Sequence, residues 1–177
     1  MSSSFSVTNN WYLRNNYRKN VELSKMANRS DISDMKLAGA DSAALKRGIR
    51  SLRDYKYEDT KKLSSKDTDN VLGKAQFYGN LKAFADTYNY TLDSGKKSSN
   101  ADIKKITRNM KNIANKYSKE LDELGVTFDS KGYMKISASA VDNIKLSTYE
   151  EKLAGSDFLK DLEKNTQKIY RRIDTYL

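Results

Sequence analysis

Residues 101–136 read ADIKKITRNMKNIANKYSKELDELGVTFDSKGYMKI, and this stretch decides the expected fold. Its apolar residues recur at spacings of three and four, at Ile103, Ile106, Met110, Ile113, Tyr117, Leu121 and Leu124. Such spacing places side chains on one face of an α-helix. The pattern therefore predicts a helix over 101–124, with Ser99 or Asn100 as its N-terminal cap.

The end of the same stretch changes from a helical to an alternating pattern. Gly125 stands where a left-handed helix stop is common. Residues 126–128 and 134–136 then alternate apolar and polar side chains around the turn sequence Asp-Ser-Lys-Gly at 129–132. This pattern predicts a two-stranded β-hairpin near 126–136. An isolated hairpin is only marginally stable, so we expect it to pack on a helix.

The residues before this stretch predict its helical partner. A helix is expected over 68–92, capped by Asp67 or Thr68, with one apolar stripe formed by Tyr78, Leu81, Ala85, Tyr88 and Leu92. Ser94-Gly95 is expected to end it, and the polar turn 94–100 then joins it to 101–124 as an antiparallel helical hairpin. Gly73 and Gly79 are unfavourable inside a helix, and close helix–helix approach is one use for them.

Three further segments complete the expected architecture. A helix is predicted over 41–57 and a short one over 139–146, and Ser147 stands at capping-box spacing from Glu150. The last helix is expected from Ser156 to the C-terminus, with Thr166 as a polar gap in its apolar stripe. The expected fold class is mainly α: an antiparallel bundle or hairpin of long helices with one small two-stranded β-hairpin.

Residues 1–40 are expected to form a separate N-terminal arm, partly helical or disordered until assembled, and 41–177 to form the helical bundle domain. The arm begins with a Ser-, Thr- and Asn-rich run and carries several aromatic residues. Aromatic residues are enriched at protein interfaces. The residues expected to make subunit or partner contacts are Trp11, Tyr12, Tyr17, Ile169, Ile173 and Tyr176.

Composition argues against most enzyme mechanisms. The 177 residues include no His and no Cys. The commonest general base and the thiolate nucleophile are therefore missing. The chain is expected not to be an enzyme, with no catalytic, metal-binding or cofactor-binding residues and no cofactor. No run of 18 apolar residues occurs, so no membrane insertion is expected.

Charge alternates in blocks along the chain. The net charge is +10, with +7 in residues 96–119 and −5 in residues 120–163. The positive block supplies a candidate basic face, Lys104, Lys105, Arg108 and Lys111, which lies off the apolar stripe of 101–124. Three interpretations stay open for this face: a solvated surface, docking to an acidic face of a neighbour, or binding of nucleic acid.

Two segments carry a resemblance to a known family. They are FADTYNYTL at 84–92 and LDELGVTFDSKGYM at 121–134. Both resemble the bacterial flagellar axial proteins, and most of all the C-terminal region of the filament-cap (hook-associated protein 2) family, over about residues 78–146. A weaker similarity to the N-terminal region of flagellins lies in LSKM at 23–26 and AGADSAAL at 38–45.

The resemblance implies a secreted structural or assembly protein that associates with itself, as an oligomer or filament, or with other axial-type helical proteins. It also implies export without a cleaved signal peptide, to the cell surface or beyond. The alternative that the charge leaves open is a basic helical nucleic-acid-binding protein, and the alternative location is the cytoplasm.

Overall fold

The structure is a computed structural model that describes residues 29, 32–54 and 68–174. Its elements in chain order are α2 (Asp34–Asp54), α3 (Thr68–Lys97), α4 (Ala101–Lys116), α5 (Ser118–Asp122), β1 (Val126–Phe128), β2 (Met134–Ile136), α6 (Ala138–Asn143), α7 (Leu146–Tyr149), the π-helical turn η2 (Glu150–Ala154) and α8 (Asp157–Asp174). The expected class, mainly α with one small hairpin, is confirmed.

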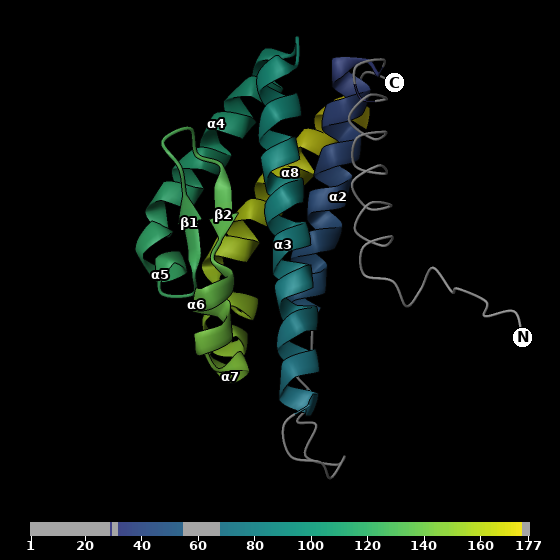
Figure 1. Cartoon of the computed structure of the whole chain (residues 1–177). Helices are drawn as coiled ribbons and strands as arrows, with labels where there is room; N and C mark the ends of the chain where they lie inside the picture. Colours follow the sequence, from purple (N-terminus) through teal and green to yellow (C-terminus); the bar gives the residue numbers. More distant parts are fainter. Residues whose placement is uncertain (1–28, 30–31, 55–67, 175–177) are drawn as a thin grey trace, which may run out of the picture. The chain divides into compact units, whose positions relative to one another are not determined.

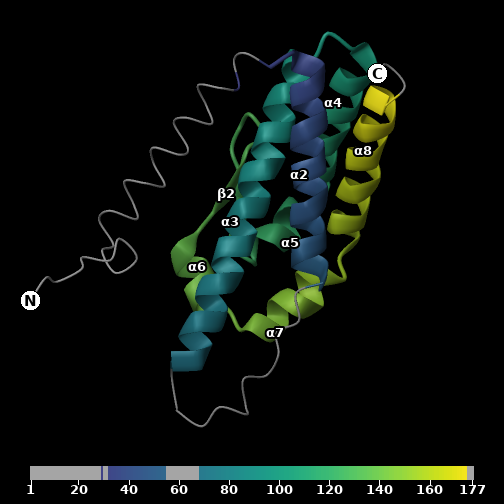
Figure 2. The same cartoon turned by 90° about the vertical axis from the view of Figure 1, so that its right-hand side faces the viewer.

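Four long helices form the bundle, and successive members run in opposite directions (Figure 1). Helix α2 packs between α3 and α8, and α4 packs against both α3 and α8 (Figure 2). The four helices thus close a ring of contacts around one apolar interior. The short elements α5, α6, α7 and η2 lie at the end of the bundle where α8 begins.

The interior is built from the apolar faces that the helical spacing predicts. Fully or nearly fully buried side chains come from all four long helices and from the hairpin; the largest are Tyr88, Tyr149, Phe77, Phe84, Phe158, Leu45, Ile49, Leu52, Leu81, Leu92, Ile103 and Met110. Phe158 of α8 meets the Phe84 ring edge-to-face, with ring centroids 6.3 Å apart, and so joins α8 to α3. Burial of these faces is the main stabilising term for a helical bundle.

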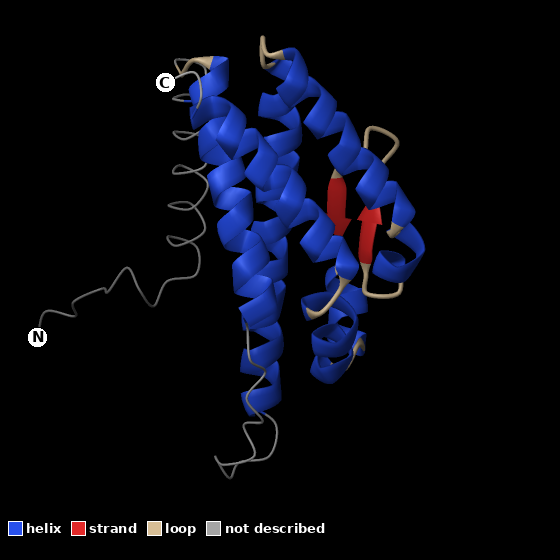
Figure 3. Ribbon diagram, turned by 180° about the vertical axis from the view of Figure 1, so that it is seen from behind, coloured by secondary structure: helices blue, strands red, loops and turns tan. Residues whose placement is uncertain are grey.

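The hairpin follows the sequence prediction closely. β1 and β2 pair antiparallel (Figure 3). Thr127 stands opposite Lys135 in this pairing. Gly125 and Gly132 both have positive φ, 72° and 83°, as a helix stop and a tight turn require. The turn is closed by the Asp129 carboxylate, which accepts hydrogen bonds from the backbone N–H groups of Lys131 and Tyr133 at 2.8 and 2.9 Å.

Two helix ends differ from the sequence prediction. α2 begins at Asp34, so residues 34–40 belong to a helix of the bundle rather than to the arm. α3 continues through Ser94-Gly95 to Lys97, and the Ser94 hydroxyl donates to the Tyr90 carbonyl within the helix at 3.0 Å. Gly95 is needed there because a Cβ atom would overlap the Thr107 hydroxyl oxygen on α4.

Gly79, by contrast, has no atom within 4 Å of the place where a Cβ would stand, so it mediates no close approach. The glycines at close helix contacts are Gly39 against Ile173, Gly48 against Phe84 and Thr87, and Gly95 against Thr107. Helix propensity identifies costly glycines, but only the fold shows which of them face a neighbour.

The remaining boundaries are partly confirmed. The expected helix 101–124 is divided at Tyr117 into α4 and α5. Asn100 caps α4 by accepting hydrogen bonds from the N–H groups of Asp102 and Ile103. Ser156 caps α8, whereas Ser147 lies within α7 and not at its start. Over the described ranges, no helix is both long and apolar enough to cross a membrane.

Candidate protein-interaction surface

The hairpin is attached to the bundle through one asparagine of α3. The Asn89 side-chain amide donates to the Met134 carbonyl at 2.9 Å, and the Met134 N–H donates to Asn89 Oδ1 at 2.7 Å. Both backbone groups of one β2 residue are thus satisfied by one side chain. Next to this pair of bonds, the buried Tyr88 ring packs edge-to-face on Phe128 of β1, with centroids 6.1 Å apart.

A second polar contact lies one helical turn further along α3. The Tyr133 hydroxyl donates to the Asp93 carboxylate and accepts from the Lys96 ammonium at 3.0 Å. The same ammonium lies 4.3 Å from the centre of the Tyr133 ring. The hydrogen bond to Asp93, with burial, raises the pKa of Tyr133 to about 12, so this phenol stays neutral and has a structural role.

Lys111 of α4 connects this contact to the hairpin turn. Its aliphatic stem lies against Gly132. A Cβ atom added at position 132 would lie 3.2 Å from Lys111 Cγ. Burial and the neighbouring Lys96 both lower the pKa of Lys111, and Asp129 opposes that shift. Two ammonium groups are therefore held close together where α3, α4 and the turn meet.

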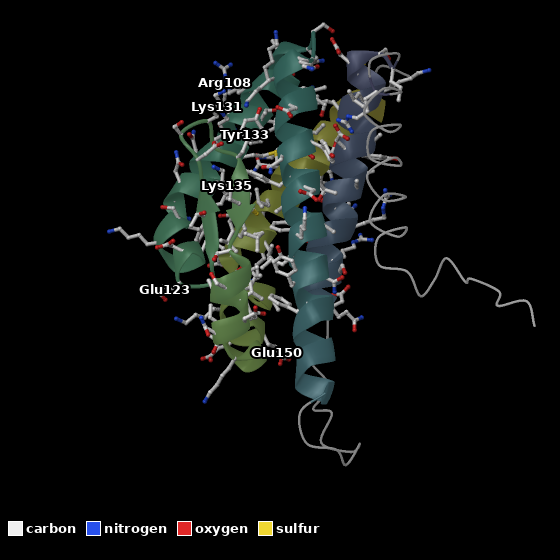
Figure 4. The ribbon with its side chains drawn as sticks, viewed as in Figure 1. Arg108, Glu123, Lys131, Tyr133, Lys135 and Glu150 are labelled. Atoms are coloured by element: carbon white, nitrogen blue, oxygen red, sulfur yellow. The ribbon has the colours of Figure 1, made fainter. Side chains whose placement is uncertain are left out.

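The structure brings part of the predicted basic face together with this pair. Lys104, Arg108 and Lys111 are spaced by four and three residues and share one side of α4, whereas Lys105 lies about 100° around the helix from Lys104. No described carboxylate is within ion-pair distance of Lys104, Lys105 or Arg108. Figure 4 shows Arg108, Lys131 and Tyr133 near the same end of the bundle. We define the basic surface as Lys96, Lys104, Arg108, Lys111 and Lys131.

A group of opposite charge lies toward the other end. Lys152 of η2 pairs with Glu123, which follows the last residue of α5, at 2.8 Å. The hydrogen bond to Glu123 raises the pKa of Lys152, and Glu151 and Glu120 add to the shift. Glu120 lies three residues before Glu123, and Glu151 is next to Lys152 in the chain. We define Glu120, Glu123 and Glu151 as the acidic surface. Figure 4 shows Glu123 far from Arg108 and Lys131.

The predicted contact residues of the last helix have a different role. Ile169 is fully buried and Ile173 is 6% exposed, and both belong to the apolar interior of this chain. Their assignment to a subunit interface is therefore wrong for the folded chain, because their side chains already pack inside the bundle. Trp11, Tyr12, Tyr17 and Tyr176 lie outside the described residues.

Among the described residues, no three His, Cys, Asp or Glu side chains are grouped so that they could hold a metal ion. An open groove of about 340 Å³ runs between α3 and β2, lined by Tyr78, Lys82, Ala85, Asp86, Met134, Lys135 and Ile136. Lys82 and Asp86 pair within it at 3.1 Å. The polar chemistry of the described surface is thus mainly that of charged side chains.

Sequence reasoning missed the roles of Asn89, Asp93 and Lys96. Asparagine is disfavoured inside helices, but this gave no specific signal for Asn89, because Asn109 in the middle of α4 is exposed. Asp93 and Lys96 gave no signal either, because their roles depend on the tyrosine that the hairpin brings to them.

No protein-family model matches the chain, and no curated protein or solved structure matches it.

Proposed function

We propose that this chain is a non-enzymatic structural or assembly protein of the flagellar axial kind, which acts by docking to further copies of itself or to other helical axial-type proteins. One observation carries the proposal. The two segments that resemble the filament-cap family, 84–92 and 121–134, form a single unit in which Asn89 holds Met134. The resemblance therefore concerns residues that depend on one another, rather than two unrelated strings.

The chemistry of the chain supports the non-enzymatic part of the proposal. It has no His and no Cys. Two of the three described tyrosines with raised pKa values are hydrogen-bonded within the fold, since the Tyr149 hydroxyl donates to the Leu124 carbonyl at 3.0 Å and the Tyr133 hydroxyl donates to Asp93. The third, Tyr88, is buried in the interior. We place the protein in a cell-surface or extracellular appendage, with the cytoplasm as the alternative.

Sedimentation velocity over a wide concentration range, with negative-stain imaging of the same samples, tests the proposal. Discrete oligomers or filaments are expected. The triple variant Trp11→Ala/Tyr12→Ala/Tyr17→Ala should associate more weakly, since aromatic side chains anchor interfaces. Tyr170→Ala is the matched control, because Tyr170 is 53% exposed on α8 and is outside the proposed contact set. A monomer at every concentration contradicts self-association.

A second candidate function is binding of nucleic acid. It is favoured by Lys104 and Arg108, because neither side chain forms an ion pair with a described carboxylate. Fluorescence anisotropy with a labelled oligonucleotide tests this function. Binding through phosphate contacts must weaken steeply as salt rises, because the released counterions drive it. Binding that is insensitive to salt excludes this mode.

A further inference from the structure

The basic surface gathers cations from three elements that meet at one end of the bundle. Lys96 comes from α3, Lys131 from the hairpin turn, and the other three from one side of α4. Two carboxylates lie among them, and both are engaged: Asp93 accepts from the Tyr133 hydroxyl, and Asp129 accepts from two turn N–H groups. The local charge is therefore net positive, and the chain brings no further described carboxylate to Lys104 or Arg108.

The acidic surface has the complementary composition. Its three carboxylates outnumber its single ammonium, that of Lys152, so the group is net negative. Glu120 of α5, Glu123 at the end of α5 and Glu151 of η2 are all exposed. The Glu123–Lys152 ion pair at 2.8 Å places the end of α5 beside η2, so the three carboxylates belong to neighbouring elements.

The basic and acidic surfaces of one molecule do not contact each other. Figure 4 shows Glu123, of the acidic surface, far from Arg108 and Lys131, of the basic surface. The Debye length is about 10 Å at 0.1 M salt, so attraction across the molecule is mostly screened. A contact between two molecules removes that separation.

We propose that the basic surface is the docking site for the acidic surface of a second copy of this chain. This inference rests on the proposed function and adds to it the two surfaces that meet. Because the two surfaces differ, one contact leaves a free basic surface on one copy and a free acidic surface on the other. The assembly then either grows or closes by symmetry, and both forms contain the same contact.

A protein partner fits this surface better than nucleic acid does. Separate carboxylates on a protein can pair with these cations one at a time. The chain also carries its own complement, in the −5 block at 120–163 that follows the +7 block at 96–119.

Two charge-reversal variants of the full chain test the contact. Lys104→Glu/Arg108→Glu reverses the basic surface, and Glu120→Lys/Glu151→Lys reverses the acidic surface while keeping Glu123. All four side chains are exposed, so the fold should persist, which circular dichroism and thermal unfolding check. Each variant alone should show at least a roughly tenfold weaker association constant in sedimentation velocity at 0.05 M salt, because like charges then face each other. An equimolar mixture of the two should recover association.

The control variant separates the contact from overall repulsion. Lys104→Glu/Arg108→Glu lowers the net charge from +10 to +6, since each substitution changes it by two. Reduced repulsion alone would strengthen association. Arg47→Glu/Lys168→Glu also gives +6 but changes exposed residues of α2 and α8. It should associate at least as well as the unaltered chain.

The outcomes distinguish this inference from the proposed function. Association that is equally strong in all variants overturns the charge contact and leaves self-assembly standing. An unaltered chain that stays monomeric from 0.05 M to 0.5 M salt overturns both. If Lys104→Glu/Arg108→Glu loses binding to a single-stranded DNA oligonucleotide but associates normally, the basic surface is a nucleic-acid site and the inference is wrong.

Discussion

Helix α3 makes two kinds of contact, and they differ in what holds them. Toward α2 and α4 it packs by apolar burial and close backbone approach, as at Gly48 and Gly95. Toward the hairpin it is held by directed hydrogen bonds: Asn89 donates to and accepts from the Met134 backbone, and Asp93 accepts from the Tyr133 hydroxyl. The first kind of contact depends on volume and the second on the placement of polar atoms. Substitutions should therefore affect the two sides of α3 in different ways.

The largest expected effect is on the bundle interior. Ile169→Ala should lower the free energy of unfolding by about 2–5 kcal/mol, because it removes buried methyl groups and leaves a cavity. The neighbouring Tyr170 is 53% exposed, so Tyr170→Ala should change stability by less than about 0.5 kcal/mol. Denaturant titration followed by circular dichroism measures both. Equal effects would mean that Ile169 is not a core residue.

The next effect is steric and occurs where α3 meets α4. Gly95→Ala should cost about 1–3 kcal/mol, because the new methyl overlaps the Thr107 hydroxyl oxygen and lies 3.1 Å from Thr107 Cβ and Cγ2. Thr107→Ala should reduce that cost in a double-mutant cycle. Gly79→Ala is the matched control: the site is free of neighbours, so the change should stabilise the helix by about 0.4–1 kcal/mol. A cost that Thr107→Ala does not relieve would place the strain elsewhere.

The hairpin side should respond to the loss of hydrogen bonds. Asn89→Ala removes both bonds to Met134 and should cost about 1–3 kcal/mol. Hydrogen exchange locates the effect: the Met134 amide should lose protection, while amides of the α8 core lose less. Asn109→Ala on the exposed side of α4 is the control. If the Met134 amide keeps its protection, Asn89 does not hold the hairpin.

The same comparison explains how much the sequence could predict. The fold followed from local patterns: the spacing of Ile103, Ile106 and Met110, and the positive-φ positions Gly125 and Gly132. Ile169 and Ile173 were correctly placed on an apolar face, but a sequence cannot show whether such a face packs within one chain or between two. The hairpin contacts depend on a strand and a helix that are about 40 residues apart, so no local pattern indicated that Asp93 would meet Tyr133.

The sequence predicts a basic face of four residues, and three of them share one side of α4 in the structure. Lys104, Arg108 and Lys111 share one side of α4 by helical spacing alone, a geometry that counting residues could have shown. Lys96 and Lys131 join them only because α3 ends and the hairpin turns at the same place. Their contribution needed the fold.

The smallest expected effect on stability is that of a substitution at Tyr88 of α3. Its hydroxyl is buried and meets no hydrogen-bond partner among the described residues, and burial raises the pKa of Tyr88 well above the ordinary 10.0. Tyr88→Phe should therefore leave stability unchanged at pH 7 or raise it by up to about 1 kcal/mol, because a desolvated hydroxyl is removed. Tyr149→Phe is the contrast, since it loses the bond to the Leu124 carbonyl and should cost about 1 kcal/mol.

The pH dependence gives the Tyr88 prediction its sign. Because burial raises the pKa of Tyr88 on folding, the free energy of unfolding is highest below pH 10 and falls as pH rises, since the unfolded chain deprotonates first. Tyr88→Phe should therefore lose less stability between pH 9 and pH 11 than the unaltered chain, as measured by denaturant titration at each pH. Identical alkaline losses in the two proteins would show that the Tyr88 hydroxyl reaches water or a partner, and the contact of α3 with the hairpin would then be polar throughout.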